Sequence, residues 1–175
     1  MIDFDELNAL TEASIRVRNT PDEVIKDVRG WLEGLFARGI LEIDEEFEFY
    51  FTMSPEEFLN REIEGKTYED RIREHWQNSD VEGIKCVVAT EANRMYNCGR
   101  DETAKAYSQA TGREVWKIWN TQHDNRVRTS HSYLESEMVR VGEPFYTYDG
   151  DSAMYPGGFE KAENNVNCRC FIEYS

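Results

Sequence analysis

The sequence predicts an α+β fold, in which a helical N-terminal part precedes a C-terminal domain of helices and a small antiparallel sheet. Helix-start signals crowd the first half of the chain, and apolar residues recur at helical spacing through its middle. After Trp119, short alternating segments are separated by glycine and proline, which is typical of strands and turns. We place an acidic, mainly helical region at residues 1–65 and the C-terminal domain at residues 66–175.

Helix starts in the first half are marked by a capping residue followed three positions later by an acid. Thr20 and Glu23, with a proline between them, form such a capping box. The segments that begin at Ser54 and Thr67 repeat the pattern. Gly39 is expected to end the helix that starts after Thr20, because glycine favours the left-handed conformation of a C-cap.

An aromatic segment lies between the first two of these helices. Phe47, Phe49 and Phe51 alternate with Glu48 and Tyr50. This period of two predicts a short strand, with a helix as the alternative because glutamate-rich runs tolerate both states.

Residues 84–120 contain few glycines and are predicted to be mostly helical, in two consecutive segments. The chain then changes character. We expect two short extended segments around Gly142 and Pro144, a turn-rich loop at 153–162, and a final strand at 168–175.

The net charge of −15 limits the classes of partner. Residues 1–84 carry 9 basic and 22 acidic side chains, a net of −13, whereas residues 85–131 carry 8 basic and 5 acidic, a net of +3. Such an acidic chain repels nucleic acid, so we expect DNA binding to be weak at most. The basic side chains that would serve it are Arg94, Arg100, Lys105, Arg113 and Lys117. The acidic half is either a soluble charged surface or a docking face for a basic partner.

No apolar run approaches the roughly 20 residues of a membrane span, and the first residues do not resemble a signal peptide, so we expect no membrane contact and synthesis in a cytoplasm. Four cysteines in that compartment are expected to be thiols or metal ligands. No dinucleotide-binding, Walker or nucleophile-elbow motif is present, and we expect no enzymatic activity.

Three residues could form one chemical site. Cys168 and Cys170 lie close to the end of the sequence, and His131 lies 37 residues before Cys168. They could hold zinc, which prefers such sulfur and nitrogen ligands. They could instead pack as the end of a strand, with Asp124 pairing with Arg126 or Arg128 to brace the preceding turn. A cysteine nucleophile activated by His131 and oriented by Asp124 is the third interpretation.

Several segments in order resemble one family. They are KTYEDRIREHW, VATEANRMYNCGR, WNTQHDNRVRTSH, GEPF and YPGGFEKAENNVNCRC. Together they resemble the phage head-morphogenesis family of Mu F-like minor head proteins, from about residue 66 to the end. The motif residues that carry the resemblance are Trp119, Thr121, Asp124, Arg126, Arg128, His131, Asn167, Cys168, Arg169 and Cys170.

The resemblance implies a minor capsid protein that is associated with the portal and the head interior and helps DNA packaging or ejection. The implied partners are the portal protein, the major capsid protein or both, and self-association in the virion stays open. The implied location is the virion, after synthesis in the host cytoplasm. The family implies no enzymatic activity and no cofactor except zinc.

The resemblance also bears on the metal. Many relatives carry a C-x-x-C pair and a terminal H-x-x-C-x-C, which would make a closed four-ligand zinc site. In this chain Arg128 and Asn165 stand at two of those positions. His131, Cys168 and Cys170 remain as candidate metal ligands.

A second functional class stays open beside this one. The chain could be a toxin or effector domain of phage origin, either zinc-dependent or related to ADP-ribosyltransferases. In the latter case Arg126, Tyr133 and Glu173 are the residues expected to contribute to the site.

Overall fold

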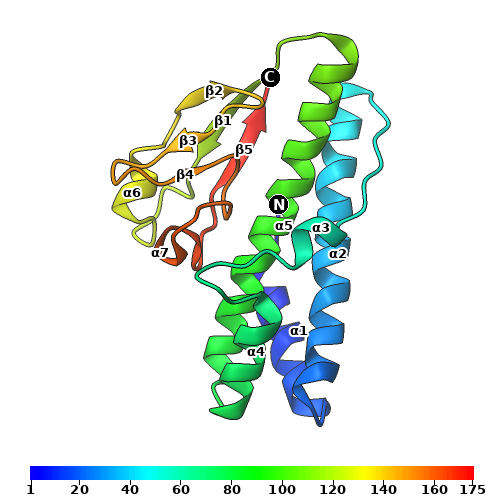
Figure 1. Cartoon of the computed structure of the whole chain (residues 1–175), viewed down its shortest axis with the longest axis vertical. Helices are drawn as coiled ribbons and strands as arrows, with labels where there is room; N and C mark the ends of the chain where they lie inside the picture. Colours follow the sequence, from blue (N-terminus) through cyan, green and yellow to red (C-terminus); the bar gives the residue numbers. More distant parts are fainter.

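Two long helices, α2 (Pro21–Phe47) and α5 (Val81–Thr111), lie side by side along the molecule (Figure 1). They belong to a computed structural model that describes residues 1–175. The other helices are α1 (Phe4–Val17), α3 (Glu56–Leu59), α4 (Tyr68–Gln77), α6 (Thr129–Ser132) and α7 (Ala162–Asn165). The strands are β1 (Trp116–Asn120), β2 (Met138–Arg140), β3 (Phe145–Tyr146), β4 (Ser152–Ala153) and β5 (Phe171–Tyr174). The predicted α+β class is confirmed.

Two of the three predicted capping boxes are present. The Thr20 side chain accepts from the backbone N–H of Glu23 at 3.3 Å, and the Glu23 carboxylate accepts from that of Thr20 at 3.1 Å. Thr67 caps α4 in the same reciprocal way. At the third position Ser54 accepts only from the N–H of Glu56, and α3 is a single turn.

The prediction that Gly39 ends a helix is wrong, because α2 continues to Phe47. Gly39 instead permits contact between the two long helices. A Cβ added there would lie 2.3 Å from the carbonyl oxygen of Tyr96 on α5. Gly99 has the reciprocal role, since its Cβ would lie 2.2 Å from the carbonyl oxygen of Phe36 on α2. The helices therefore cross backbone to backbone at these two glycines.

The predicted strand around Phe49 is also wrong. Phe47 is the last residue of α2, and Glu48 ends the helix in the left-handed region at φ 50°. Phe47 stacks on Tyr107 of α5 with ring centroids 4.6 Å apart, and Phe49 meets the same ring edge-on at 5.5 Å. The alternating aromatics thus pack on the end of α5 instead of pairing with another strand.

Residues 81–111 form one continuous helix, and residues 116–120, which were predicted to be helical, form strand β1. Gly112 ends α5 in the left-handed region. β1 then lies in the middle of an antiparallel sheet of order β2-β1-β5, where Trp119 is opposite Ile172. Its side chains alternate in burial, and this short alternation was hidden by the helical pattern before it.

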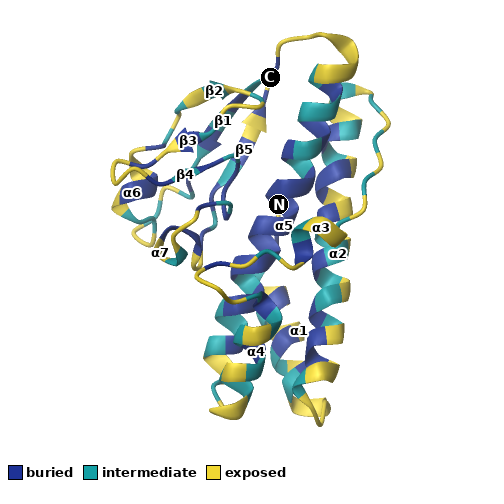
Figure 2. Ribbon diagram, viewed as in Figure 1, coloured by how far each residue is buried: buried dark blue, intermediate teal, exposed yellow.

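Helix α5 joins two apolar cores. One core lies among α1, α2, α4 and the first half of α5, and the other lies between the sheet and the second half of α5. Residues 90–99 are buried on every side, as the dark middle of α5 in Figure 2 shows. The polar side chains in this stretch must therefore find partners inside the protein. No helix has the length and apolar character needed to cross a membrane.

Candidate metal centre

The Cys-x-Cys pair lies in a turn, not in the final strand. β5 begins at Phe171, after both cysteines. Asn167 adopts the left-handed conformation at φ 53°, and the N–H of Cys168 donates to the carbonyl oxygen of Asn165 at 3.1 Å. Residues two apart would share a face in a strand as well, and here the turn directs both thiols toward His131.

Helix α5 holds this turn through polar side chains. The hydroxyl of Thr90 accepts from the N–H of Asn167 at 3.0 Å. The side-chain amides of Asn93 and Asn97 donate to the carbonyl oxygen of Cys170 at 3.2 and 3.3 Å. Sequence reasoning missed these three residues. The available signal was their spacing, which places three polar residues on one side of a helix otherwise expected to be core.

His131 completes the cluster from α6. Its Nδ1 atom lies 3.5 Å from Sγ of Cys168 and 3.5 Å from Sγ of Cys170. The three residues are 1%, 3% and 3% exposed. Trp119 covers the imidazole edge-on with ring centroids 5.5 Å apart, and Phe159 stacks on it at 5.4 Å. The fold therefore brings together the three residues that the sequence suggested as one site.

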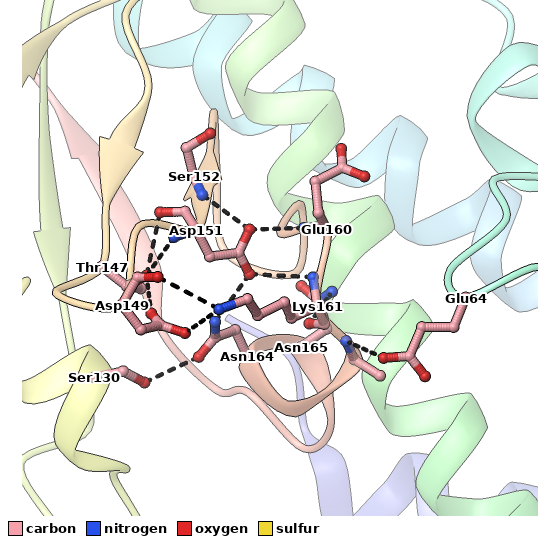
Figure 3. Close-up of polar contacts among 11 residues, drawn as sticks. Glu64, Ser130, Thr147, Asp149, Asp151, Ser152, Glu160, Lys161, Asn164 and Asn165 are labelled. Atoms are coloured by element: carbon pink, nitrogen blue, oxygen red, sulfur yellow. Dashed lines mark hydrogen bonds and ion pairs between the residues drawn. The ribbon is translucent and has the colours of Figure 1, made fainter.

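A polar network fixes the helix that carries His131 (Figure 3). Next to it, the Ser130 hydroxyl donates to Asn164 at 3.1 Å, and Asn164 donates to the buried carboxylate of Asp151 at 2.9 Å. The other donors to Asp151 are the backbone N–H groups of Ser152, Glu160 and Lys161. Although burial raises the pKa of Asp151, the hydrogen bonds from Asn164 and these N–H groups outweigh it, so its pKa is lowered.

The donor geometry fits a zinc ion. Zinc bonds of about 2.3 Å to sulfur and about 2.0–2.1 Å to nitrogen, at a tetrahedral angle, place nitrogen and sulfur about 3.5–3.6 Å apart. Both observed separations from His131 Nδ1 are 3.5 Å. The ligand atoms of His131, Cys168 and Cys170 all lie within 4.8 Å of one another. These three residues would hold the ion.

The thiols differ in acidity. The hydrogen bond from Cys170, followed by that with His131, holds the pKa of Cys168 well below its usual range. The same sulfur–sulfur contact and burial raise the pKa of Cys170. A metal ion held by both sulfurs would favour the deprotonated form of each thiol.

Arg128 and Asn165, at the two positions where the resemblance implies further metal ligands, are held elsewhere. The Arg128 guanidinium donates to the carbonyl oxygens of Glu163 and Val166. The Asn165 amide donates to the carbonyl oxygen of Phe159 at 2.7 Å and accepts from its N–H at 3.0 Å. Both therefore brace the α7 segment.

Of the two pairings expected for Asp124, with Arg126 or with Arg128, only the one with Arg126 is present, and it is not the strongest. Asp124 pairs with Arg169 at 2.7 Å, and more weakly with the exposed Arg126 at 3.4 Å. The hydrogen bond from Arg169 lowers the pKa of Asp124 to about 2. Asp124 does not contact His131, whose hydrogen-bond partners are the two cysteines, so it is not positioned to orient a catalytic histidine.

Most of the predicted motif residues gather around one small hollow. Its lining includes Arg126, Arg128, His131, Asn167, Cys168, Arg169 and Cys170. Two other motif residues do not line it. Trp119 on β1 packs against His131, and the backbone N–H of Thr121, just after β1, donates to the carboxylate of Glu135 at 2.8 Å.

The basic residues considered for DNA contact are largely unsuited to it. Arg94 is 1% exposed and pairs with Glu91 at 2.6 Å. Lys117 is fully buried, where it pairs with Asp101 at 3.4 Å. Arg100 is engaged by Glu42 at 2.7 Å. These charges stabilise the interior instead of forming a basic surface.

The chain is similar to known proteins from about one third of its length almost to its end. The family model for phage Mu protein F-like proteins matches residues 57–173. The NAD(+)–arginine ADP-ribosyltransferase EFV of Enterococcus faecalis is 34% identical over 114 residues, which are 62% of this chain and 22% of that protein. The minor head protein GP7 of Bacillus phage SPP1 is 29% identical over 90 residues, which are 51% of this chain and 29% of that protein. The chain thus spans less than a third of either relative. No solved structure matches.

Proposed function

The chain belongs to the phage Mu protein F-like family, and from this premise we propose that it is a minor component of a phage head. The observation that carries the proposal is the family match over residues 57–173, together with the similarity to a minor head protein. The site also supports this proposal, because most of its predicted motif residues surround one turn and have a structural role there. We propose an assembly role without catalysis.

In finer terms, we propose that the chain sits in the head interior or at the portal, where it contacts the portal or major capsid protein and assists DNA packaging or ejection. The net charge of −13 over residues 1–84 supports a basic protein surface as the partner. We propose residues 1–84 as the partner-binding region. Direct DNA contact is at most a minor part of this proposal, because Arg94 and Lys117 are buried.

Quantitative mass spectrometry of purified heads from the encoding phage tests the proposed location. Peptides of this chain should copurify with filled heads in fixed proportion to the major capsid protein, and their absence would refute the head assignment. Binding of the full chain to purified portal or capsid protein should weaken as salt rises, because charged surfaces are screened. Binding that salt does not weaken would contradict a charged docking face.

We further propose that His131, Cys168 and Cys170 hold a zinc ion with a structural role. The observation that favours it is the pair of 3.5 Å separations from Nδ1 to the two sulfurs. Metal bonds would join the end of the chain to α6, which lies far earlier in the sequence. Elemental analysis of protein without a histidine tag should find about one zinc per chain, whereas less than about 0.2 would leave the cysteines as packing residues.

The alternative function is ADP-ribosyl transfer, the activity in the name of one relative. That similarity covers 22% of the relative. Arg126 lines two hollows, and neither of them is lined by Tyr133 or Glu173. Tyr133 instead lies beside Tyr148 with ring centroids 5.6 Å apart. Incubation with labelled NAD and bacterial lysate tests this alternative, and label transferred to protein would establish it over the structural role.

A further inference from the structure

A hollow of very small volume lies directly beside the three ligand residues. Its volume is about 10 Å³, and its lining includes His131, Cys168, Cys170 and Arg128. A hollow of this size accommodates about one water molecule. It shares Arg126, Arg128, Asn167, Cys168 and Arg169 with a larger hollow of about 690 Å³, which continues to the N-terminal residues and α5.

No fourth protein ligand joins the cluster. The group of side chains able to bind a metal here consists of His131, Cys168 and Cys170 alone. Arg128 lines the same hollow, but a guanidinium has only donor groups and stays protonated, so it cannot bind a metal. Its hydrogen bonds to the carbonyl oxygens of Glu163 and Val166 hold it at the wall of the hollow.

The charge around the small hollow favours an anion. A divalent ion and two thiolates cancel, and the imidazole of His131 is neutral when it binds a metal. Arg126 and Arg169 share the single carboxylate of Asp124, while Arg128 binds only neutral carbonyl groups. No acidic residue lines the small hollow. Positive charge therefore exceeds negative charge at its wall.

We propose that the fourth position of this metal centre is open, and that it takes one small anion or a water molecule beside Arg128. This inference rests on the proposed zinc site and adds to it. A four-ligand site of sulfur and nitrogen is closed to outside ligands, whereas three protein ligands leave one position exchangeable. Arg128 is the residue that makes this difference in the chain.

Cobalt(II) provides the test, because its visible absorption reports its ligands and it can replace zinc. The full chain, reduced and freed of metal, is loaded with one equivalent of cobalt(II) and titrated with sodium azide. We expect a saturable change in the cobalt spectrum, as azide exchanges with the solvent ligand. Cobalt that binds with an unchanging spectrum would overturn the open position but leave the metal site intact. Failure to bind cobalt or zinc at all would instead refute the metal site itself.

A matched pair of variants identifies the residue responsible. Arg128→Cys supplies a fourth thiolate, so we expect loss of the azide response and stronger sulfur-to-cobalt absorption. Arg16→Cys makes the same change at an exposed position that lines neither hollow, and it should retain the wild-type azide response. Retention of the azide response in cobalt-loaded Arg128→Cys would contradict the role of Arg128. If that variant does not fold, the wild-type titration decides the proposal, and Arg128→Ala should weaken azide binding by removing the positive charge.

Discussion

The side-chain amide of Asn97, in the middle of α5, donates to the carbonyl oxygen of Cys170 at 3.3 Å, 73 residues later in the chain. Asn97 is fully buried. Its hydrogen bond connects the helix that joins the two apolar cores to the turn that carries both cysteines. The position of the candidate ligands therefore depends on α5 as well as on the turn itself.

Replacing Asn97 with leucine should lower the free energy of unfolding by about 1–3 kcal/mol, because it removes a buried donor and leaves Asn93 as the sole amide on that carbonyl. It should also weaken zinc binding by loosening the turn. Chemical denaturation and a chelator competition measure the two effects. Asn125→Ala, at an exposed position, is the control. Wild-type stability and zinc affinity in Asn97→Leu would contradict this role.

The crossing of α2 and α5 gives a second prediction. Gly99→Ala should cost about 1–3 kcal/mol of stability, because its Cβ would lie 2.2 Å from a backbone oxygen and the helices must move apart. Gly34→Ala on α2 meets nothing within 4 Å and should be neutral or slightly stabilising, since alanine favours helix. Thermal unfolding of the two variants tests the contrast, and equal melting temperatures would exclude a tight crossing.

The network around Asp151 gives a third prediction. Asp151→Asn should lower the free energy of unfolding by about 1–3 kcal/mol. The new side-chain amide would point its own N–H group at the N–H donors that Asp151 accepts from, and these would stay buried without an acceptor. Asp149→Asn should have a smaller effect, since Asp149 is paired with the partly exposed Lys161 at the surface. Urea unfolding compares them. A larger loss in Asp149→Asn would refute the central position of Asp151.

The same carboxylate predicts a dependence on pH. The pKa of Asp151 is lower in the folded protein than its ordinary value of 3.8. Its contribution to stability is therefore present above that ordinary value and is lost as pH falls through the lowered one. The stability gap between wild type and Asp151→Asn should be constant near about pH 6 and shrink below about pH 4. A gap that grows on acidification would mean that the folded pKa is raised.

Local signals predicted the helices and the α+β class well. The capping boxes at Thr20 and Thr67 involve residues three positions apart, so sequence alone contains them. Gly39 and Phe49 were misassigned because their roles depend on Tyr96 and Tyr107 of α5, which lie more than fifty residues later in the chain. A glycine used for close contact and a glycine used as a helix end look the same in sequence.

The three residues of the candidate site could be singled out from the sequence, but the residues that support them could not. His131, Cys168 and Cys170 stand out by residue type, and the fold brings them together. The pairing of Asp124 was predicted from sequence neighbours, whereas the stronger partner, Arg169, lies 45 residues away. The division at residue 65 and the proposed partners remain predictions.

The zinc X-ray absorption spectrum of the full chain, purified without a histidine tag, tests the account most directly. Three protein ligands and one outside ligand predict two sulfurs at about 2.3 Å and two lighter atoms at about 2.0–2.1 Å. Cys168→Ser should remove one sulfur from that shell, while Cys86→Ser should leave it unchanged. Protein without bound zinc, or a shell without two sulfurs, would contradict the assignment of His131, Cys168 and Cys170 as a metal centre.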